Sequence, residues 1–144
     1  MIRVFIDASV LFAATYSAKG TARDLIMLGL HQKLTLVISQ HVILEARTNI
    51  ANKYPERLLT FDQLIMAAGF EEVTKPTRDE VLAAAAFTAL KDAPIVAAAI
   101  KAECTHLATY DHKHLLDRTE MAQQSGLRIA TPADILNDIP PEAK

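Results

Sequence analysis

The sequence contains only one cysteine, Cys104, among its 144 residues. A single cysteine excludes an internal disulfide, and this usage fits a reducing compartment. Cys104 lies in an alanine-rich segment, and no residue pattern that would activate a thiol surrounds it. We therefore interpret it as a small core residue rather than a nucleophile.

Long apolar runs are also absent. Charged residues interrupt each apolar stretch before it reaches the roughly 20 residues that a membrane-spanning helix requires. The first residues resemble a strand, and they lack the basic leader, long apolar stretch and cleavage site of a secretory signal. We therefore expect a cytoplasmic protein that has no membrane partner.

Neither sign of charge dominates the chain. Fifteen basic and seventeen acidic side chains give a formal net charge of −2. This balance excludes binding to nucleic acid through overall charge, so any such contact must come from a local patch. The candidates for contacts with an RNA backbone are Arg47, Lys53 and Arg57, together with Lys19 and Arg23.

The composition is that of a soluble globular protein, with 51% hydrophobic and 22% charged residues. A chain of this length buries roughly 70% of its unfolded surface, which is enough for a substantial core. The sequence contains no internal repeat, linker or low-complexity tract. We predict one domain over residues 1–144, with a core of about 2–136 and a tail over 137–144.

Short apolar segments alternate with helical ones, as in a parallel α/β architecture. Strands are expected at 2–6, 34–38, 70–73, 105–109 and 127–129. Helices are expected after 19–21, after Ser39, over 55–68, from 77–80, over 92–104 and 113–126, with a final turn from 131–134. Ser39 is the predicted N-cap of its helix, and Thr77 with Glu80 fits a capping box.

Two aspartates follow predicted strands directly. Asp7 ends the run 2–6, and Asp111 closes the run 106–110. Residues just past the carboxyl ends of parallel strands line a shared crevice, so these carboxylates are expected to face each other. Carboxylates brought together repel unless a cation lies between them, and oxygen ligands suit Mg²⁺ or Mn²⁺. Metal-assisted phosphodiester chemistry is therefore the leading hypothesis.

Two further acidic residues are candidates for the same site. Asp92 introduces a helix that is almost wholly apolar, so the helix must be buried and its acidic tip must face a cleft. Glu45 lies on a helix beside His41 and Asn49. Each acid also has an ordinary alternative. The two residues Asp7 and Asp92 could be N-caps, Asp111 a turn residue, and Glu45 an exposed side chain on a solvated helix face.

The contexts of the four acids, taken together and in order, resemble the PIN-domain family. The matching segments are Ile6-Asp7-Ala8-Ser9, Ile43-Leu44-Glu45-Ala46, Asp92-x-x-Ile95 and Thr109-x-Asp111. The resemblance spans residues 2 to about 136. It implies a three-layer α/β/α sandwich and a Mg²⁺- or Mn²⁺-dependent ribonuclease with Asp7, Glu45, Asp92 and Asp111 in an acidic pocket. It also implies a VapC-like toxin with a small antitoxin partner, and a homodimer.

Two hydroxyl side chains are expected to orient the acids. On this interpretation Ser9 hydrogen-bonds Asp7 and Thr109 hydrogen-bonds Asp111, with local capping as the alternative. The family often has a further acid and an aromatic ring beyond the last aspartate. Here that stretch is 112–115, His-Lys-His-Leu, which lacks both. Its histidines either contact phosphate or are exposed residues at a helix start.

Three other classes compete with the nuclease. A phosphoacceptor receiver domain would need an acidic pair after the first strand and a lysine after a late one, whereas the chain has Asp7 alone and Asp111 at the late position. A phosphatase with an aspartyl nucleophile would need an aspartate where Ser9 stands. A catalytically silent binding module with the same fold would differ only in lacking activity.

Overall fold

The computed structural model describes residues 1–144 and contains one five-stranded parallel sheet. The strand order is β3-β2-β1-β4-β5, and each neighbouring pair is parallel. The strands are β1 (Arg3–Ile6), β2 (Thr35–Ile38), β3 (Glu71–Glu72), β4 (His106–Ala108) and β5 (Arg128–Ala130). All five lie within or overlap the segments predicted as strands.

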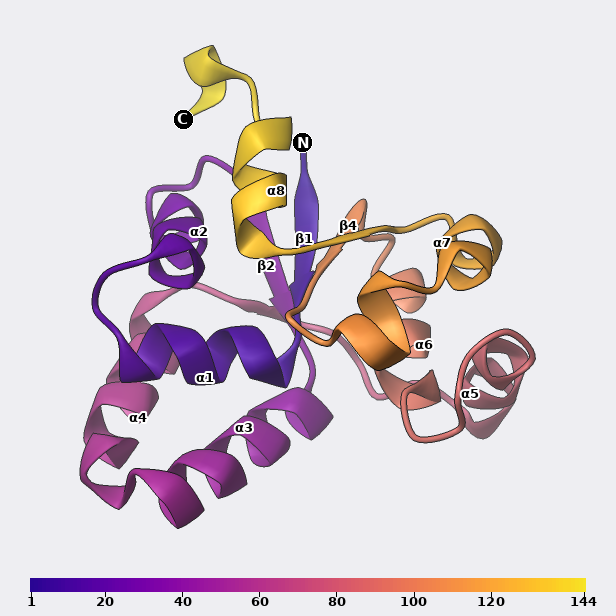
Figure 1. Cartoon of the computed structure of the whole chain (residues 1–144), viewed down its shortest axis with the longest axis horizontal. Helices are drawn as coiled ribbons and strands as arrows, with labels where there is room; N and C mark the ends of the chain where they lie inside the picture. Colours follow the sequence, from indigo (N-terminus) through magenta and orange to yellow (C-terminus); the bar gives the residue numbers. More distant parts are fainter.

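Eight α-helices surround the sheet (Figure 1). They are α1 (Ala8–Tyr16), α2 (Thr21–Leu30), α3 (Gln40–Lys53), α4 (Leu58–Ala67), α5 (Arg78–Ala85), α6 (Ala93–Lys101), α7 (Thr119–Ser125) and α8 (Pro132–Asp138). Short helical turns add η1 (Pro55–Arg57), η2 (His112–Leu116) and η3 (Pro141–Ala143). The arrangement is the predicted α/β/α fold.

The direction of chain progression across the sheet reverses between β1 and β4. The first three strands advance from β1 to β3 in one direction, whereas β4 and β5 lie on the other side of β1. Right-handed crossovers therefore place the helices before β3 on one face and α5 to α7 on the other. Contacts of α8 with α2, and of α5 with α6, agree with this division. Ligand sites in such sheets lie at the carboxyl ends of the strands beside the reversal.

The central strand is buried on both sides, which explains its uniformly apolar sequence. Val4, Phe5 and Ile6 have no exposed surface. Parallel strands covered by helices on both faces require apolar side chains at successive positions rather than alternate ones. Helix α6 follows the same logic, because Val96 and its alanine neighbours are almost fully buried. These two apolar segments fix Asp7 and Asp92 at their ends.

Several elements differ from the sequence-based expectation. Helix α1 was not predicted as an element, since its residues are apolar all around and show no helical periodicity. The predicted helix over 113–126 is divided into η2 and α7, and the helix over 55–68 begins as the 3₁₀ turn η1. Helix α6 ends at Lys101, before Cys104.

The C-terminal segment continues further than the predicted single turn. Helix α8 extends to Asp138, whose carboxylate accepts a hydrogen bond from Arg128 Nε at 3.0 Å. The next residue, Ile139, is 2% exposed. None of the helices combines the length and apolarity needed to cross a bilayer.

Candidate active site

All four acidic residues singled out in the sequence line one cavity of about 250 Å³. Asp7 follows β1, Glu45 lies on α3, Asp92 precedes α6, and Asp111 follows β4 by two residues. Figure 1 shows α1 and α3 starting near the carboxyl ends of the central strands, where the cavity forms. The cavity therefore lies beside the point at which the strand order reverses, as expected for this type of sheet.

The Asp7 side chain is held by hydroxyl groups rather than by a helix cap. Asp7 occupies the N-cap position of α1, yet its side chain accepts no capping hydrogen bond from that helix. Instead Oδ2 accepts hydrogen bonds from Ser9 Oγ at 3.0 Å and Thr109 Oγ1 at 2.7 Å. The residue as a whole is 6% exposed. These two hydrogen bonds fix the orientation of the Asp7 carboxylate in the wall of the cavity.

Thr109 contacts Asp7 rather than the Asp111 carboxylate that the sequence analysis assigned to it. Its hydroxyl accepts a hydrogen bond from the Asp111 backbone N–H at 3.0 Å while it donates to Asp7. The prediction paired residues that are two positions apart in sequence, whereas the Thr109 side chain reaches from the end of β4 to the residue that follows β1. One fully buried threonine therefore links the two strand-end aspartates.

The Asp111 carboxylate caps a helical turn and also lines the cavity. Its Oδ1 accepts a hydrogen bond from the His114 backbone N–H at 3.0 Å, which caps the turn η2. Its Oδ2 lies 3.3 Å from His114 Nδ1. The histidine is thus beside the site and partly buried. The two alternatives from the sequence, a turn residue and a site residue, therefore both apply to Asp111.

Asp92 is buried, but no hydrogen bond orients its side chain. Its side chain makes no capping hydrogen bond to α6, and the residue is 7% exposed. Oδ2 is buried and has no hydrogen-bond partner. Burial raises the pKa of this carboxyl, repulsion from Asp111 and Asp7 raises it further, and Lys91 and His114 oppose the rise. A buried carboxylate oxygen without a partner is destabilising, and it is free to accept a cation or a hydrogen-bond donor from the cavity.

Glu45 is exposed to solvent on α3, yet it belongs to the cavity. Burial of part of the carboxyl raises its pKa, and repulsion from Asp7 adds to this, while His41 lowers it. Asp92 repels the Glu45 carboxyl as well, so the pKa of Glu45 responds to two of the other acids of the cavity. Asn49, one turn further along α3, also lines the cavity.

The oxygen donors fit a hard divalent cation in kind. Four carboxylates surround one space, and one buried oxygen of Asp92 lacks a partner. In this arrangement, however, no three acidic, histidine or cysteine side chains lie close enough together to hold one ion. Coordination therefore requires side-chain rotation, for which the exposed Glu45 has room.

Lys91 is a cavity residue that the sequence analysis did not identify. Its position directly before Asp92 was the only available signal. An ammonium group among four carboxylates reduces their repulsion, and Lys91 opposes the pKa rise of both Asp92 and Glu45. Lys91 is therefore the basic side chain of the cavity that partly offsets the negative charge of the acids.

The basic residues predicted to contact RNA do not line the acidic cavity. Arg47 is paired with Asp62 at 3.3 Å. The ammonium of Lys53 lies 5.5 Å from the Phe12 ring centroid. The Arg57 guanidinium lies 5.9 Å from the Tyr16 ring centroid, and Nη2 of Arg23 donates a hydrogen bond to the carbonyl of Ala14 at 2.5 Å.

Cys104 occupies the core, as its sequence context predicted. Burial raises the pKa of its thiol to about 12. A thiol with such a pKa is protonated at neutral pH and is a poor nucleophile.

Comparison with known proteins gives one family and several structural neighbours. A model of the PIN domain matches residues 3–113. No curated protein sequence matches significantly. The structure is similar to PAE2754 from Pyrobaculum aerophilum, with 17% identity, a TM-score of 0.65, and coverage of 94% of this chain and 88% of that one.

Two further neighbours have the same fold at low identity. VapBC2 from Rickettsia felis, solved with a promoter DNA fragment, is 14% identical, with a TM-score of 0.63 and coverage of 89% and 97%. VapC20 from Mycobacterium tuberculosis, a toxin that cleaves the sarcin-ricin loop, is 18% identical, with a TM-score of 0.54 and coverage of 76% and 91%. At these identities the likeness concerns the fold alone.

Proposed function

The chain belongs to the PIN domain family, and from this premise we propose that it is an endoribonuclease that depends on Mg²⁺ or Mn²⁺. The observation that carries the proposal is the convergence of Asp7, Glu45, Asp92 and Asp111 on one cavity at the strand-order reversal. The strand order also argues against a receiver domain, because doubly wound folds of that type have the order 2-1-3-4-5.

The four carboxylates would hold the cation, with Asn49 at the rim. When bound, such a cation lowers the pKa of a coordinated water and stabilises charge on phosphate oxygens. Ser9 and Thr109 fix Asp7, and the Thr109 hydroxyl connects Asp7 to the backbone of Asp111. Lys91 moderates the negative charge, which lets a phosphodiester approach the acidic cavity.

We further propose that the protein is a toxin with a small antitoxin partner, that it forms a homodimer and that it acts in the cytoplasm. The support is the family together with the structural likeness to VapBC2 and VapC20. A neighbouring open reading frame that encodes a small DNA-binding protein would favour this role over RNA processing.

Two measurements on one purified sample test the proposal. Calorimetry with Mg²⁺ and Mn²⁺ reports metal binding, and incubation with single-stranded RNA, with and without a chelator, reports cleavage. We expect binding and chelator-sensitive cleavage, with both reduced in Glu45→Gln. The effect of Glu45→Gln should be non-additive with that of Asp7→Asn, since both act on one ion.

Other outcomes of these measurements identify the alternatives. Metal binding without cleavage of any RNA would favour the catalytically silent binding module. Cleavage at wild-type rates by Glu45→Gln at limiting metal would remove Glu45 from the site and leave three aspartates.

A further inference from the structure

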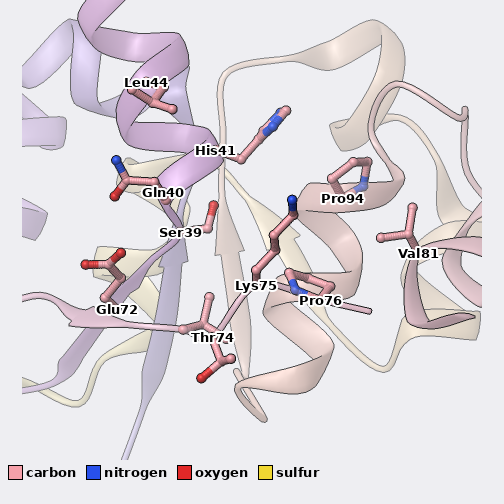
Figure 2. A pocket seen from close by; sticks show the side chains of 11 residues that line it. Ser39, Gln40, His41, Leu44, Glu72, Thr74, Lys75, Pro76, Val81 and Pro94 are labelled. Atoms are coloured by element: carbon pink, nitrogen blue, oxygen red, sulfur yellow. The ribbon is translucent and has the colours of Figure 1, made fainter. Parts of the chain in front are cut away.

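A second and larger cavity of about 580 Å³ lies beside the acidic one. Its walls come from the start of α3, the connection between β3 and α5, α5 itself and the first turn of α6 (Figure 2). We call it the Lys75 cavity and define it by His41, Leu44, Lys75, Pro76, Val81 and Pro94. Its volume is within the range of about 300–1,000 Å³ that is typical of small-molecule sites.

The two cavities share helices α3 and α6. A shallow opening along α3, formed by His41, Leu44, Glu45 and Asn49 with Thr48, joins them, because the first two residues also line the Lys75 cavity and the next two the acidic one. Neighbouring residues at the start of α6 also line different cavities. Pro94 lines the Lys75 cavity, while Asp92 and Ile95 line the acidic one. A polymer held at the acids can therefore continue along α3.

The Lys75 cavity offers an apolar surface together with a cation. Leu44 is 55% exposed at its edge, and two prolines and Val81 supply further apolar wall. Figure 2 shows the Lys75 side chain rising into the space between His41 and Pro94. No carboxylate lies within ion-pair distance of the Lys75 ammonium. The only acid in the lining, Glu72, lies on the opposite side of Ser39 in this view.

We propose that the Lys75 cavity is a subsite for a nucleotide that flanks the scissile phosphate of an RNA substrate, an inference that rests on the proposed nuclease function. An unpaired base buries its faces against the apolar wall and the His41 imidazole, as bases of single-stranded RNA do on rings and apolar groups. The Lys75 ammonium neutralises the phosphate of the same nucleotide. The occupant is thus a single-stranded, unstacked nucleotide rather than a base pair.

Substitutions that fill the cavity or remove its charge test the subsite. Val81→Trp places a large ring in the cavity, and Leu82→Trp is its matched control, because Leu82 is the next residue of α5, is 51% exposed and does not line the cavity. Lys75→Ala is compared with Lys33→Ala. Lys33 is exposed and precedes β2, whereas the Lys75 cavity lies at the other end of β2, where Ser39 follows the strand. Circular dichroism and melting curves confirm that all four variants fold.

The first readout is steady-state cleavage of a single-stranded RNA. Stacking of one base contributes a binding free energy that corresponds to about a tenfold or larger change in affinity. We expect KM to rise about tenfold in Val81→Trp, and to rise also in Lys75→Ala, while kcat stays within about twofold, since the lost binding is shared by ground state and transition state. The two controls should match the wild type. An unchanged KM in Val81→Trp would overturn the subsite.

The second readout does not depend on cleavage. The wild-type protein and Val81→Trp are titrated with each of the four ribonucleoside 5′-monophosphates in the presence of a chelator, and NMR shifts are followed at His41 and Leu44, which line the cavity in both proteins. Shifts at these residues that disappear in Val81→Trp support the subsite even if no RNA is cleaved, in which case only the nuclease proposal fails. RNA cleavage with no such shifts and no effect of Val81→Trp would refute the subsite and leave the nuclease proposal intact.

Discussion

Replacing Asp92 by asparagine should stabilise the metal-free protein while impairing the site. Asp92 is 7% exposed, its Oδ2 lacks a hydrogen-bond partner, and two neighbouring aspartates repel it. A buried polar group without a partner costs about 1–3 kcal/mol. Asparagine keeps the shape and removes the charge, but it still leaves one atom without a partner. We therefore expect a gain of about 1 kcal/mol in the free energy of unfolding, near the lower end of that range.

Thermal unfolding in the presence of a chelator measures this gain. For a chain of this size, 1 kcal/mol corresponds to an increase in Tm of about 2–4 °C. Asp117→Asn is the control, because the Asp117 side chain is 73% exposed and its replacement should change stability by no more than about 0.5 kcal/mol. Adding Mg²⁺ or Mn²⁺ should then raise the Tm of the wild type more than that of Asp92→Asn. A lower Tm for Asp92→Asn without metal, or equal gains with metal, would refute the argument.

Three further substitutions follow from individual contacts. Thr109→Val removes the hydroxyl that binds Asp7, so metal affinity measured by calorimetry should fall about 10- to 100-fold; unchanged affinity would exclude this positioning role. Burial lowers the pKa of His106 below 6.5, so the unfolded state binds protons first and stability falls as pH drops through 6.5. His106→Gln should lose less stability than wild type between pH 7 and 5 in denaturant titrations; equal losses would contradict this. A Cβ at Gly29 would overlap Leu36, so Gly29→Ala should destabilise by about 1–3 kcal/mol despite its better helix propensity; a stabilised variant would show that Leu36 repacks freely.

The sheet was predictable because its strands are nearly continuous apolar segments. Runs such as 2–6 and 34–38 contain too few polar residues for any surface position, which indicates a parallel sheet covered on both faces. The same regularity located the acids, since the carboxyl ends of parallel strands share one edge. Ser39 and Thr77 marked helix starts through ordinary capping chemistry, and both side chains accept the expected backbone hydrogen bonds.

Features that depend on contacts between distant segments were not predictable. Helix α1 is apolar all around because helices α2, α3 and α4 pack around it, so its sequence has no amphipathic period. The Thr109 hydroxyl could not be assigned to Asp7 without knowing that β4 pairs with β1. Lys91 gave no pattern of its own. The division of the segment 112–125 into η2 and α7 likewise depends on the cap that Asp111 provides.

Cleavage of RNA by Asp7→Asn tests the central claim most directly. The Asp7 carboxylate lies at the end of the central strand, and two hydroxyl groups orient it. The wild type should cleave RNA with Mg²⁺ or Mn²⁺ and lose that activity with a chelator. Asp7→Asn should retain its circular dichroism spectrum and lose orders of magnitude in rate. Full activity in Asp7→Asn with an unchanged metal requirement would contradict the assignment of this cavity as the nuclease site.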